Sequence, residues 1–353
     1  MKRNLRSLTL VELQSEFAAL DWPKYAADQV FTWLWQKGVD DIAAMTNLSK
    51  ERRALLAERY SVRLPELLRT VDDEDGTTKF TFKLEDGNVI ESVFIPDNDR
   101  ATVCVSTQVG CKLGCAFCYT GTLGFTRDLA WHEITAQALA VRQYLGNPKS
   151  GAPPSSLLPP PLTNVVFMGM GEPFLNYDAT IEAAKTINAE NGLGIGARRI
   201  TISTSGIPDG IKAFTQLPQQ FRLALSLNAS DDETRSKLMP VNKLHPLKEV
   251  MAAIRAYSDA RGKRVTFEYV LVDGVNNRDK DVKQFAVLLK STPCKVNLIP
   301  LNPFPGCELE SPTPESVEAF ARKLWPLVPA VTVRRSKGAS ILAGCGQLAG
   351  LTD

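Results

Sequence analysis

The segment Cys111-Lys112-Leu113-Gly114-Cys115-Ala116-Phe117-Cys118 carries three cysteines that can point their sulfurs at one small volume. No neighbouring cysteine fills a fourth position. Thiolates are the usual ligands of iron-sulfur clusters, and a [4Fe-4S] cube held by three of them leaves one iron free for an outside ligand. The segment therefore predicts an open cluster site that can reduce a bound cofactor. A zinc knuckle short of its fourth ligand and a redox thiol pair with a bystander cysteine remain as other interpretations.

Around this segment, strand-like and helix-like stretches alternate from residue 102 almost to the C-terminus, which indicates parallel βαβ units. The expected strands lie at 102–106, 164–168, 199–203, 222–227, 264–272, 295–299 and 331–334. Six such units are too few to close an eight-fold barrel, so we predict an α/β fold with a partial (β/α)6 barrel. In such barrels chemistry collects on loops that follow the strands, and the cysteine segment follows the first expected strand.

The chain before this pattern has a different character. Residues 1–65 contain short helical patterns, one of them after the cap-like Ser49, and predict a small helical accessory domain. Residues 66–96 predict a β-hairpin extension, since apolar residues alternate on both sides of a turn at 85–87. We expect the core over 97–340, with a Pro-rich surface insertion at 150–162, and a separate C-terminal segment at 341–353.

Glu91 is a carboxylate in an otherwise apolar row of the second hairpin strand, where it shares a face with Val89, Val93 and Ile95. An edge charge that faces solvent explains it as well as an acid or base aimed into a site.

Composition excludes several classes of protein. The 353 residues are 44% hydrophobic and 23% charged, as in ordinary soluble globular proteins. The formal net charge is only +2, so a nucleic-acid surface requires local segregation of charge. The absence of a long apolar run and of a signal peptide predicts a cytoplasmic protein without a membrane partner. In a reducing compartment its seven cysteines are expected to be ligands or reactive thiols.

Polar groups follow several of the expected strands. After the second strand, two glycines permit close backbone approach to a ligand, and the carboxylate of Glu172 can accept an ammonium group. The third and fourth strands end in 203–206 and 226–228, whose hydroxyl and amide groups suit ribose or carboxylate contacts, although helix capping explains some of them. Asn302 opens a rigid turn after the sixth strand.

Two cysteines outside the triplet are candidates for functional thiols. Cys345 stands between Gly344 and Gly346, where a side chain has little packing of its own, so we expect an accessible thiol. Cys104 precedes the triplet on the first expected strand and could face the same barrel mouth. Cys294 and Cys307 have no comparable surroundings, and we treat them as spectators.

In their order along the chain, these motifs resemble the radical SAM enzymes that methylate adenine at C2 in 23S ribosomal RNA and in tRNA. The likeness rests on the triplet with 120–121 and 124–125, the Gly171-Glu172-Pro173 turn, and segments 294–300, 302–306 and 345–348. It covers nearly the whole chain, including the N-terminal helices. The triplet alone indicates only radical SAM chemistry, whereas the ordered set that ends in a thiol is highly specific.

The resemblance implies a role for each matched residue. One [4Fe-4S] cluster would be bound by Cys111, Cys115 and Cys118. S-adenosylmethionine would chelate the fourth iron and contact Gly171, Glu172, Ser203, Ser226, Leu227, Asn228 and Asn302. Cys345 would carry the methyl group, Cys104 would be the resolving thiol that forms a transient disulfide with it, and Glu91 would be the proton acceptor.

The family scheme uses two S-adenosylmethionine molecules per turnover. One methylates Cys345, and the other gives a radical that takes hydrogen from the new S-methyl group. The resulting carbon radical adds to C2. Loss of the C2 proton and attack by Cys104 on Cys345 then release the methylated RNA and leave a disulfide to be reduced.

The implied partners are 23S rRNA, tRNA and a reductant such as a flavodoxin or thioredoxin-type donor, with the protein acting as a monomer. The N-terminal helices and the basic segments 198–199, 261–264 and 334–337 are the candidates for RNA contacts. Two alternatives remain, namely adenine C8 methylation of 23S rRNA, as in the sister enzymes that confer antibiotic resistance, and a divergent radical SAM enzyme with another RNA substrate.

The chain departs from the family pattern at three positions. Asn228 replaces a usual histidine, Ser340 replaces a usual acidic residue, and Tyr119 replaces a small residue. None removes a step of the scheme, but the departures point to an altered substrate choice or to a divergent branch of the family.

Overall fold

A ten-stranded mixed sheet runs through the computed structural model, which describes residues 2–146 and 162–350. Seven of its strands are parallel and alternate with helices along the chain, as the βαβ pattern predicts. They are β6 (Arg100–Cys104), β9 (Asn164–Phe167), β10 (Ile200–Thr204), β11 (Arg222–Ser226), β12 (Val265–Leu271), β13 (Cys294–Pro300) and β14 (Val331–Val333). The insertion expected at 150–162 lies, apart from Leu162, outside the described residues.

Three antiparallel strands extend this sheet beyond β6. The predicted hairpin is present as β4 (Thr78–Lys83) and β5 (Val89–Asp97), and β5 pairs with β6 so that Val93 lies opposite Cys104. A further strand, β3 (Glu66–Asp72), forms the edge next to β4. The sequence did not predict β3 because most of its side chains are exposed and show no apolar alternation.

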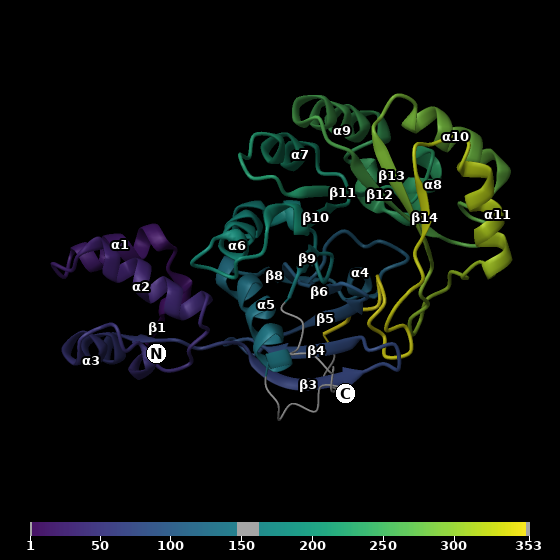
Figure 1. Cartoon of the computed structure of the whole chain (residues 1–353). Helices are drawn as coiled ribbons and strands as arrows, with labels where there is room; N and C mark the ends of the chain where they lie inside the picture. The colour runs from purple at the N-terminus through teal and green to yellow at the C-terminus, as the bar shows by residue number, and fades with distance from the viewer. Residues whose placement is uncertain (1, 147–161, 351–353) are drawn as a thin grey trace.

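Helices alternate with the parallel strands along the chain, and most of them cover the outer face of the sheet (Figure 1). They are α5 (Trp131–Gly146), α6 (Tyr177–Asn188), α7 (Pro208–Thr215), α8 (Asp232–Leu238), α9 (Leu247–Arg261), α10 (Asp279–Leu289) and α11 (Pro314–Leu324). In α9 the side chains at helical spacing from Leu247 to Tyr257 are buried, and the helix ends at Gly262 with φ +59°. No helix within residues 2–146 and 162–350 is long and apolar enough to cross a membrane.

Strand alternation separates two faces of the sheet. On β12, Phe267 and Tyr269 are fully buried, and the Tyr269 ring packs against Phe285 of α10 and Phe320 of α11. The intervening Glu268 and Val270 therefore point to the opposite, inner face. The same alternation on the other parallel strands aims a second set of side chains inward.

The N-terminal part contains α1 (Leu10–Ala18), α2 (Lys24–Trp35) and α3 (Lys50–Arg59) and lies to one side of the sheet (Figure 1). The predicted cap is present, since the Ser49 side chain accepts a hydrogen bond from Arg52 N–H. Arg142 of α5 joins this part to the barrel, because its guanidinium donates to Trp35 O at 2.7 Å and to Gln36 O at 2.8 Å. These carbonyls belong to the last turn of α2, which has no further helical donors.

Replacing Arg142 by alanine should loosen the N-terminal helices without unfolding the barrel. The change leaves the Trp35 carbonyl without a donor, which costs about 1–3 kcal/mol. Hydrogen exchange followed by mass spectrometry should show faster exchange in peptides from 10–59 and unchanged exchange in β9 to β13.

Arg255→Ala is the matched control, since Arg255 caps the Leu288 carbonyl on the far side of the barrel. Equal exchange in the N-terminal helices of both variants would contradict a joining role for Arg142.

Candidate functional site

The inner face of the sheet encloses a pocket of about 1190 Å³, its open mouth included. Residues of β5, β6, β9, β10, β11, β12 and β13 all line it, so the sheet must curve around it as a partial barrel does. Most of the candidate site residues line this pocket: Cys104, Cys111, Cys115, Cys118, Gly171, Glu172, Ser203, Ser226, Asn228 and Cys345. Glu91, Leu227 and Asn302 do not.

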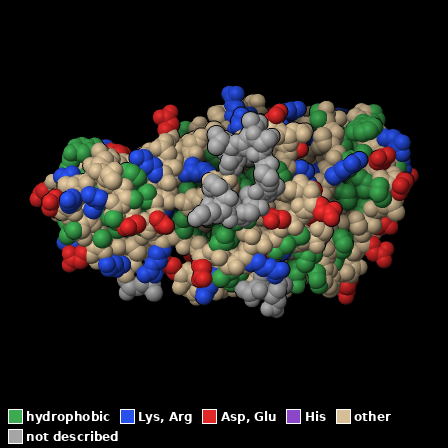
Figure 2. Space-filling view, turned by 60° about the horizontal axis from the view of Figure 1, so that its bottom comes forward, with side chains coloured by type: hydrophobic (Ala, Val, Ile, Leu, Met, Phe, Trp, Pro, Cys, Tyr) green, Lys and Arg blue, Asp and Glu red, His purple; other side chains and the backbone are tan. Residues whose placement is uncertain are grey.

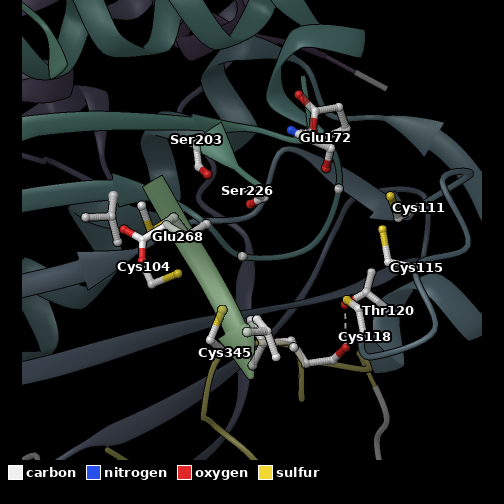
Figure 3. A pocket seen from close by; sticks show the side chains of 18 of the residues that line it. Cys104, Cys111, Cys115, Cys118, Thr120, Glu172, Ser203, Ser226, Glu268 and Cys345 are labelled. Atoms are coloured by element: carbon white, nitrogen blue, oxygen red, sulfur yellow. Dashed lines mark hydrogen bonds between the residues drawn. The ribbon is translucent and has the colours of Figure 1, made fainter. Parts of the chain in front are cut away.

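The cysteine triplet lies on a loop between β7 (Gln108–Gly110) and β8 (Phe125–Asp128), a small antiparallel pair that the sequence did not predict. Cys111 N–H donates to Gly124 O at 2.7 Å and Ala116 N–H to Leu238 O at 2.9 Å, so the backbone holds the loop against the barrel. The three sulfurs lie together at one end of the pocket (Figure 3).

Desolvation by burial raises the pKa of Cys111 to about 12 and also raises the pKa values of Cys115 and Cys118. The neighbouring thiols add to the rise at Cys115. Three thiolates gathered at one place need a cationic partner, which an iron cluster would provide.

The donor set fits a cluster better than a single ion. Among the described residues, three cysteines meet at one end of the pocket without a fourth cysteine beside them. A structural zinc site is closed by four ligands, whereas a [4Fe-4S] cluster can be bound by three cysteines with one iron left open.

Glu172 and Gly171 form the turn after β9 beside the triplet. The Glu172 carboxylate accepts Phe174 N–H at 3.0 Å and Ser205 N–H at 2.7 Å, and burial raises its pKa. The Glu172 side chain therefore ties the loops after β9 and β10 together, and its carboxylate faces the pocket, where it can accept an ammonium group.

Hydroxyl and amide side chains on or just after β10 and β11 form the next part of the pocket wall. Ser203 and Ser226 face the middle of the pocket (Figure 3). Asn228 adopts φ +56°, and its side-chain oxygen accepts Val270 N–H at 2.8 Å, so this residue shapes the turn after β11. Leu227 is fully buried and its side chain is absent from the wall, whereas its N–H donates to Glu268 O at 2.9 Å.

The C-terminal segment crosses the pocket and brings Cys345 into it. The Cys345 and Cys104 sulfurs face each other at the end of the pocket away from the triplet (Figure 3). Burial raises the pKa of Cys345 to about 11 and that of Cys104 to about 12. All seven cysteines are free thiols. Asn302 lies behind the segment, where its Nδ2 donates to Cys345 O at 3.0 Å.

Glu91 lies on the same face of β5 as the wall residue Val93, but the C-terminal segment covers it. Its carboxylate accepts Ala349 N–H at 2.8 Å and Gly350 N–H at 3.1 Å, and Lys79 Nζ lies 3.4 Å away. It is 2% exposed, so it is not an edge charge that faces solvent. The role that the resemblance implies for it stays a prediction.

Two of the departures from the family pattern make specific contacts. The Tyr119 ring stacks on Phe304 with centroids 5.0 Å apart, and its N–H donates to Gly346 O at 2.7 Å. Ser340 Oγ donates to Asp73 Oδ2 at 2.5 Å. Both contacts hold the segment that carries Cys345.

Of two further charged residues in the pocket wall, the sequence reasoning missed Glu268 and named Arg334 only as part of the basic segment 334–337. Glu268 lies on β12 and is 7% exposed, and Arg334 lies just after β14 at the mouth. A signal for Glu268 existed, because it is a carboxylate in an apolar strand, as Glu91 is. No signal distinguished Arg334 from other basic residues.

The basic segments do not converge on the pocket. Segments 198–199 and 261–264 precede β10 and β12 and lie at the opposite strand ends, whereas 334–337 follows β14 beside the mouth. On the face shown in Figure 2, Lys and Arg side chains are interspersed with Asp and Glu.

Comparisons with known proteins extend these observations. Residues 105–286 match the family profile described as the Radical SAM superfamily, and residues 3–62 match that of the Ribosomal RNA large subunit methyltransferase N-terminal domain. The chain is 44% identical over 347 residues to the "Probable dual-specificity RNA methyltransferase RlmN" of Thermotoga petrophila, covering 98% of this chain and 97% of that one. It is 42% identical over 349 residues to the "Dual-specificity RNA methyltransferase RlmN" of Syntrophus aciditrophicus, and the match covers 98% of this chain and 96% of that one.

The crystal structure of a radical SAM methyltransferase from Sphaerobacter thermophilus is also similar. It superposes with a TM-score of 0.91 at 43% identity and covers 99% of this chain and 100% of that one. The predicted α/β fold of the radical SAM type is thereby confirmed.

Gly171→Ala should lower the free energy of unfolding more than Gly87→Ala does, because only at Gly171 would the new side chain collide with a neighbour. Gly171 has φ +101°, and a Cβ there would lie 2.6 Å from Gln108 Cβ and 2.8 Å from Gln108 N. Gly87 also has a positive φ, of +86°, but nothing lies within 4 Å of an added Cβ. Urea unfolding should show that Gly87→Ala lowers the free energy of unfolding by about 1–2 kcal/mol, from backbone strain alone. Gly171→Ala should lower it clearly more. Equal losses would show that the close approach to Gln108 is unimportant.

Proposed function

We propose that this chain, which belongs to the radical SAM superfamily and within it to the RlmN-type RNA methyltransferases, methylates C2 of a specific adenine in 23S rRNA. We propose the corresponding purine next to the anticodon in tRNA as a second target, which the dual specificity named for the relatives supports. Membership itself establishes an S-adenosylmethionine-dependent RNA methyltransferase with a [4Fe-4S] cluster and two S-adenosylmethionine molecules per turnover, as the sequence predicts.

One observation carries the proposal for the reaction, namely that Cys104 and Cys345 share the pocket with the cysteine triplet. C2 of adenine is an electrophilic carbon without a nucleophilic electron pair, so direct transfer of a methyl cation has nothing to attack it. A thiol that first takes the methyl group and then presents it as a carbon radical avoids this difficulty. Cys345 is an exposed residue that also lines the pocket, which suits such a carrier.

The cluster and S-adenosylmethionine, when bound, supply the one-electron chemistry that activates an inert C–H bond. The residues of this chain hold and orient the participants. Cys111, Cys115 and Cys118 would bind the cluster, and Glu172, Ser203 and Ser226 would orient the methyl donor between the triplet and Cys345. The apolar wall of Val93, Ile95, Val166 and Leu348 excludes water from the reacting atoms.

Cys104 would release the product. Its thiolate attacks the sulfur of Cys345, and the bond from Cys345 to the transferred carbon breaks. The carbon keeps the electron pair and takes up a proton to become the methyl group, and the disulfide that forms must be reduced by an external dithiol. A flavodoxin as electron source and a thioredoxin-type donor for the disulfide are the partners we propose. The monomeric state and cytoplasmic location expected from the sequence stay predictions.

For Glu91 to accept the C2 proton, the Ala349 and Gly350 amides must release its carboxylate. We propose that the end of the C-terminal segment shifts when the target base enters. Adenine must also leave its stack to reach the pocket, which is easiest in loops and single strands.

Cys345→Ala should abolish methylation of an rRNA fragment by the anaerobically reconstituted enzyme, by at least about 10³-fold, because the methyl carrier is gone. Mass spectrometry of the digested RNA should find C2-methyladenosine with the wild-type enzyme. Cys307→Ala is the control, since Cys307 is a half-buried cysteine outside the pocket.

Methylation that survives in Cys345→Ala would overturn the carrier mechanism. A methyl group at C8 would retain the carrier and overturn the target carbon.

A further inference from the structure

The pocket contains a buried carboxylate, Glu268, that the proposed roles leave unused. It lies at the thiol end of the pocket near Cys345, whereas Glu172 lies at the cluster end (Figure 3). A methyl group carried by Cys345 must reach C2 of the adenine, so the target base must enter at the thiol end. Glu268 is therefore placed to meet the base, and Glu172 is not.

A hydrogen-bond relay fixes the Glu268 side chain. Glu268, Asn297 and Thr332 lie opposite one another on β12, β13 and β14. Thr332 Oγ1 donates to Asn297 Oδ1 at 2.6 Å, and Asn297 Nδ2 donates to Glu268 Oε1 at 2.9 Å. Because Oε1 already accepts this hydrogen bond from the amide, a proton on the carboxyl group belongs on Oε2.

Glu268 accepts fewer hydrogen bonds than Glu91 and Glu172, the other buried carboxylates in or beside the pocket. Glu91 accepts two backbone amides and lies beside Lys79, and each oxygen of Glu172 accepts a backbone amide. Glu268 Oε2 is buried and has no hydrogen-bond partner. A buried oxygen without a partner is costly and calls for a ligand that completes it.

Burial raises the pKa of Glu268 and so shifts its carboxyl group toward the neutral form, while Arg334, the hydrogen bond from Asn297 and Lys295 partly oppose the rise. Neither cation forms an ion pair within 4 Å among the described residues. A neutral carboxylic acid presents an O–H donor toward the pocket.

We propose that Glu268 recognises the target adenine by donating a hydrogen bond from Oε2–H to one of the two ring nitrogens, N1 or N3, that flank C2. The proposal rests on the proposed function, since it requires the base to meet a methyl group on Cys345. Both nitrogens are acceptors in adenine, so a neutral acid matches them and a carboxylate repels them. The hydrogen bond would place C2 against the carrier and withdraw electron density from the ring when the carbon radical adds.

Glutamine and alanine substitutions separate this role from others. Glu268→Gln keeps an N–H donor in place of the acid O–H, so it should retain discrimination and methylation within about tenfold. Glu268→Ala removes the donor. Glu318→Ala, at an exposed position of α11, controls for the loss of a glutamate. Iron content and melting temperature check that each variant is folded and loaded.

Affinity for modified RNA gives a readout that does not depend on turnover. Binding of an rRNA hairpin to the loaded enzyme is measured with adenosine, 1-deazaadenosine or 3-deazaadenosine at the target position. For the wild type, Glu318→Ala and Glu268→Gln, one of the two analogues should weaken binding by about tenfold, the worth of one buried hydrogen bond. Glu268→Ala should bind adenosine and that analogue equally.

The inference is overturned if the wild type binds both analogues as tightly as adenosine, or if Glu268→Ala still discriminates. It is also overturned if Glu268→Gln discriminates but loses methylation as completely as Glu268→Ala, since that points to proton transfer. Failure of the proposed function looks different, because the wild-type enzyme itself would then lack C2-methyladenosine or methylated Cys345.

Discussion

The site depends on the hydrogen bonds that hold the C-terminal segment against the cysteine loop. Tyr119 N–H donates to Gly346 O, Thr120 Oγ1 donates to Leu348 O, and Asn302 supports the carbonyl of Cys345. The first two contacts join residues more than two hundred positions apart, and all three have a backbone carbonyl as their acceptor. They bring Cys345, the proposed carrier, into the pocket that also contains Cys111, Cys115 and Cys118.

The two ends of the pocket differ in the partners that their ionisable groups have. At the cluster end, three desolvated thiols need a cationic group to become thiolates, and Glu172 is supplied with backbone donors. At the thiol end, Cys104 and Cys345 are desolvated, Glu268 Oε2 has no hydrogen-bond partner, and Arg334 lines the pocket. One curved sheet can thus serve the methyl donor at one end and the acceptor base at the other.

Sequence reasoning succeeded where the signal is local. The triplet spacing, the βαβ alternation and the cap at Ser49 depend on near neighbours in the chain, and the fold they predict is confirmed. It failed for β3, which is exposed and has no alternation, and for the β7–β8 pair, whose strands are very short. The inward or outward direction of Leu227, Asn302 and Glu91 depends on how loops pack, so sequence could not show that they lie outside the wall. Glu268 carried the same signal as Glu91, and only the curvature of the sheet shows that it faces the pocket.

The central claim is that three cysteines hold a cluster whose open iron faces the same pocket as Cys345. Electron paramagnetic resonance of the anaerobically prepared, reduced protein, recorded with and without S-adenosylmethionine, tests it most directly. The account predicts a [4Fe-4S] signal that changes when S-adenosylmethionine binds the open iron and that is lost in Cys118→Ala. Zinc in place of iron, or a cluster signal that S-adenosylmethionine leaves unchanged, would contradict it.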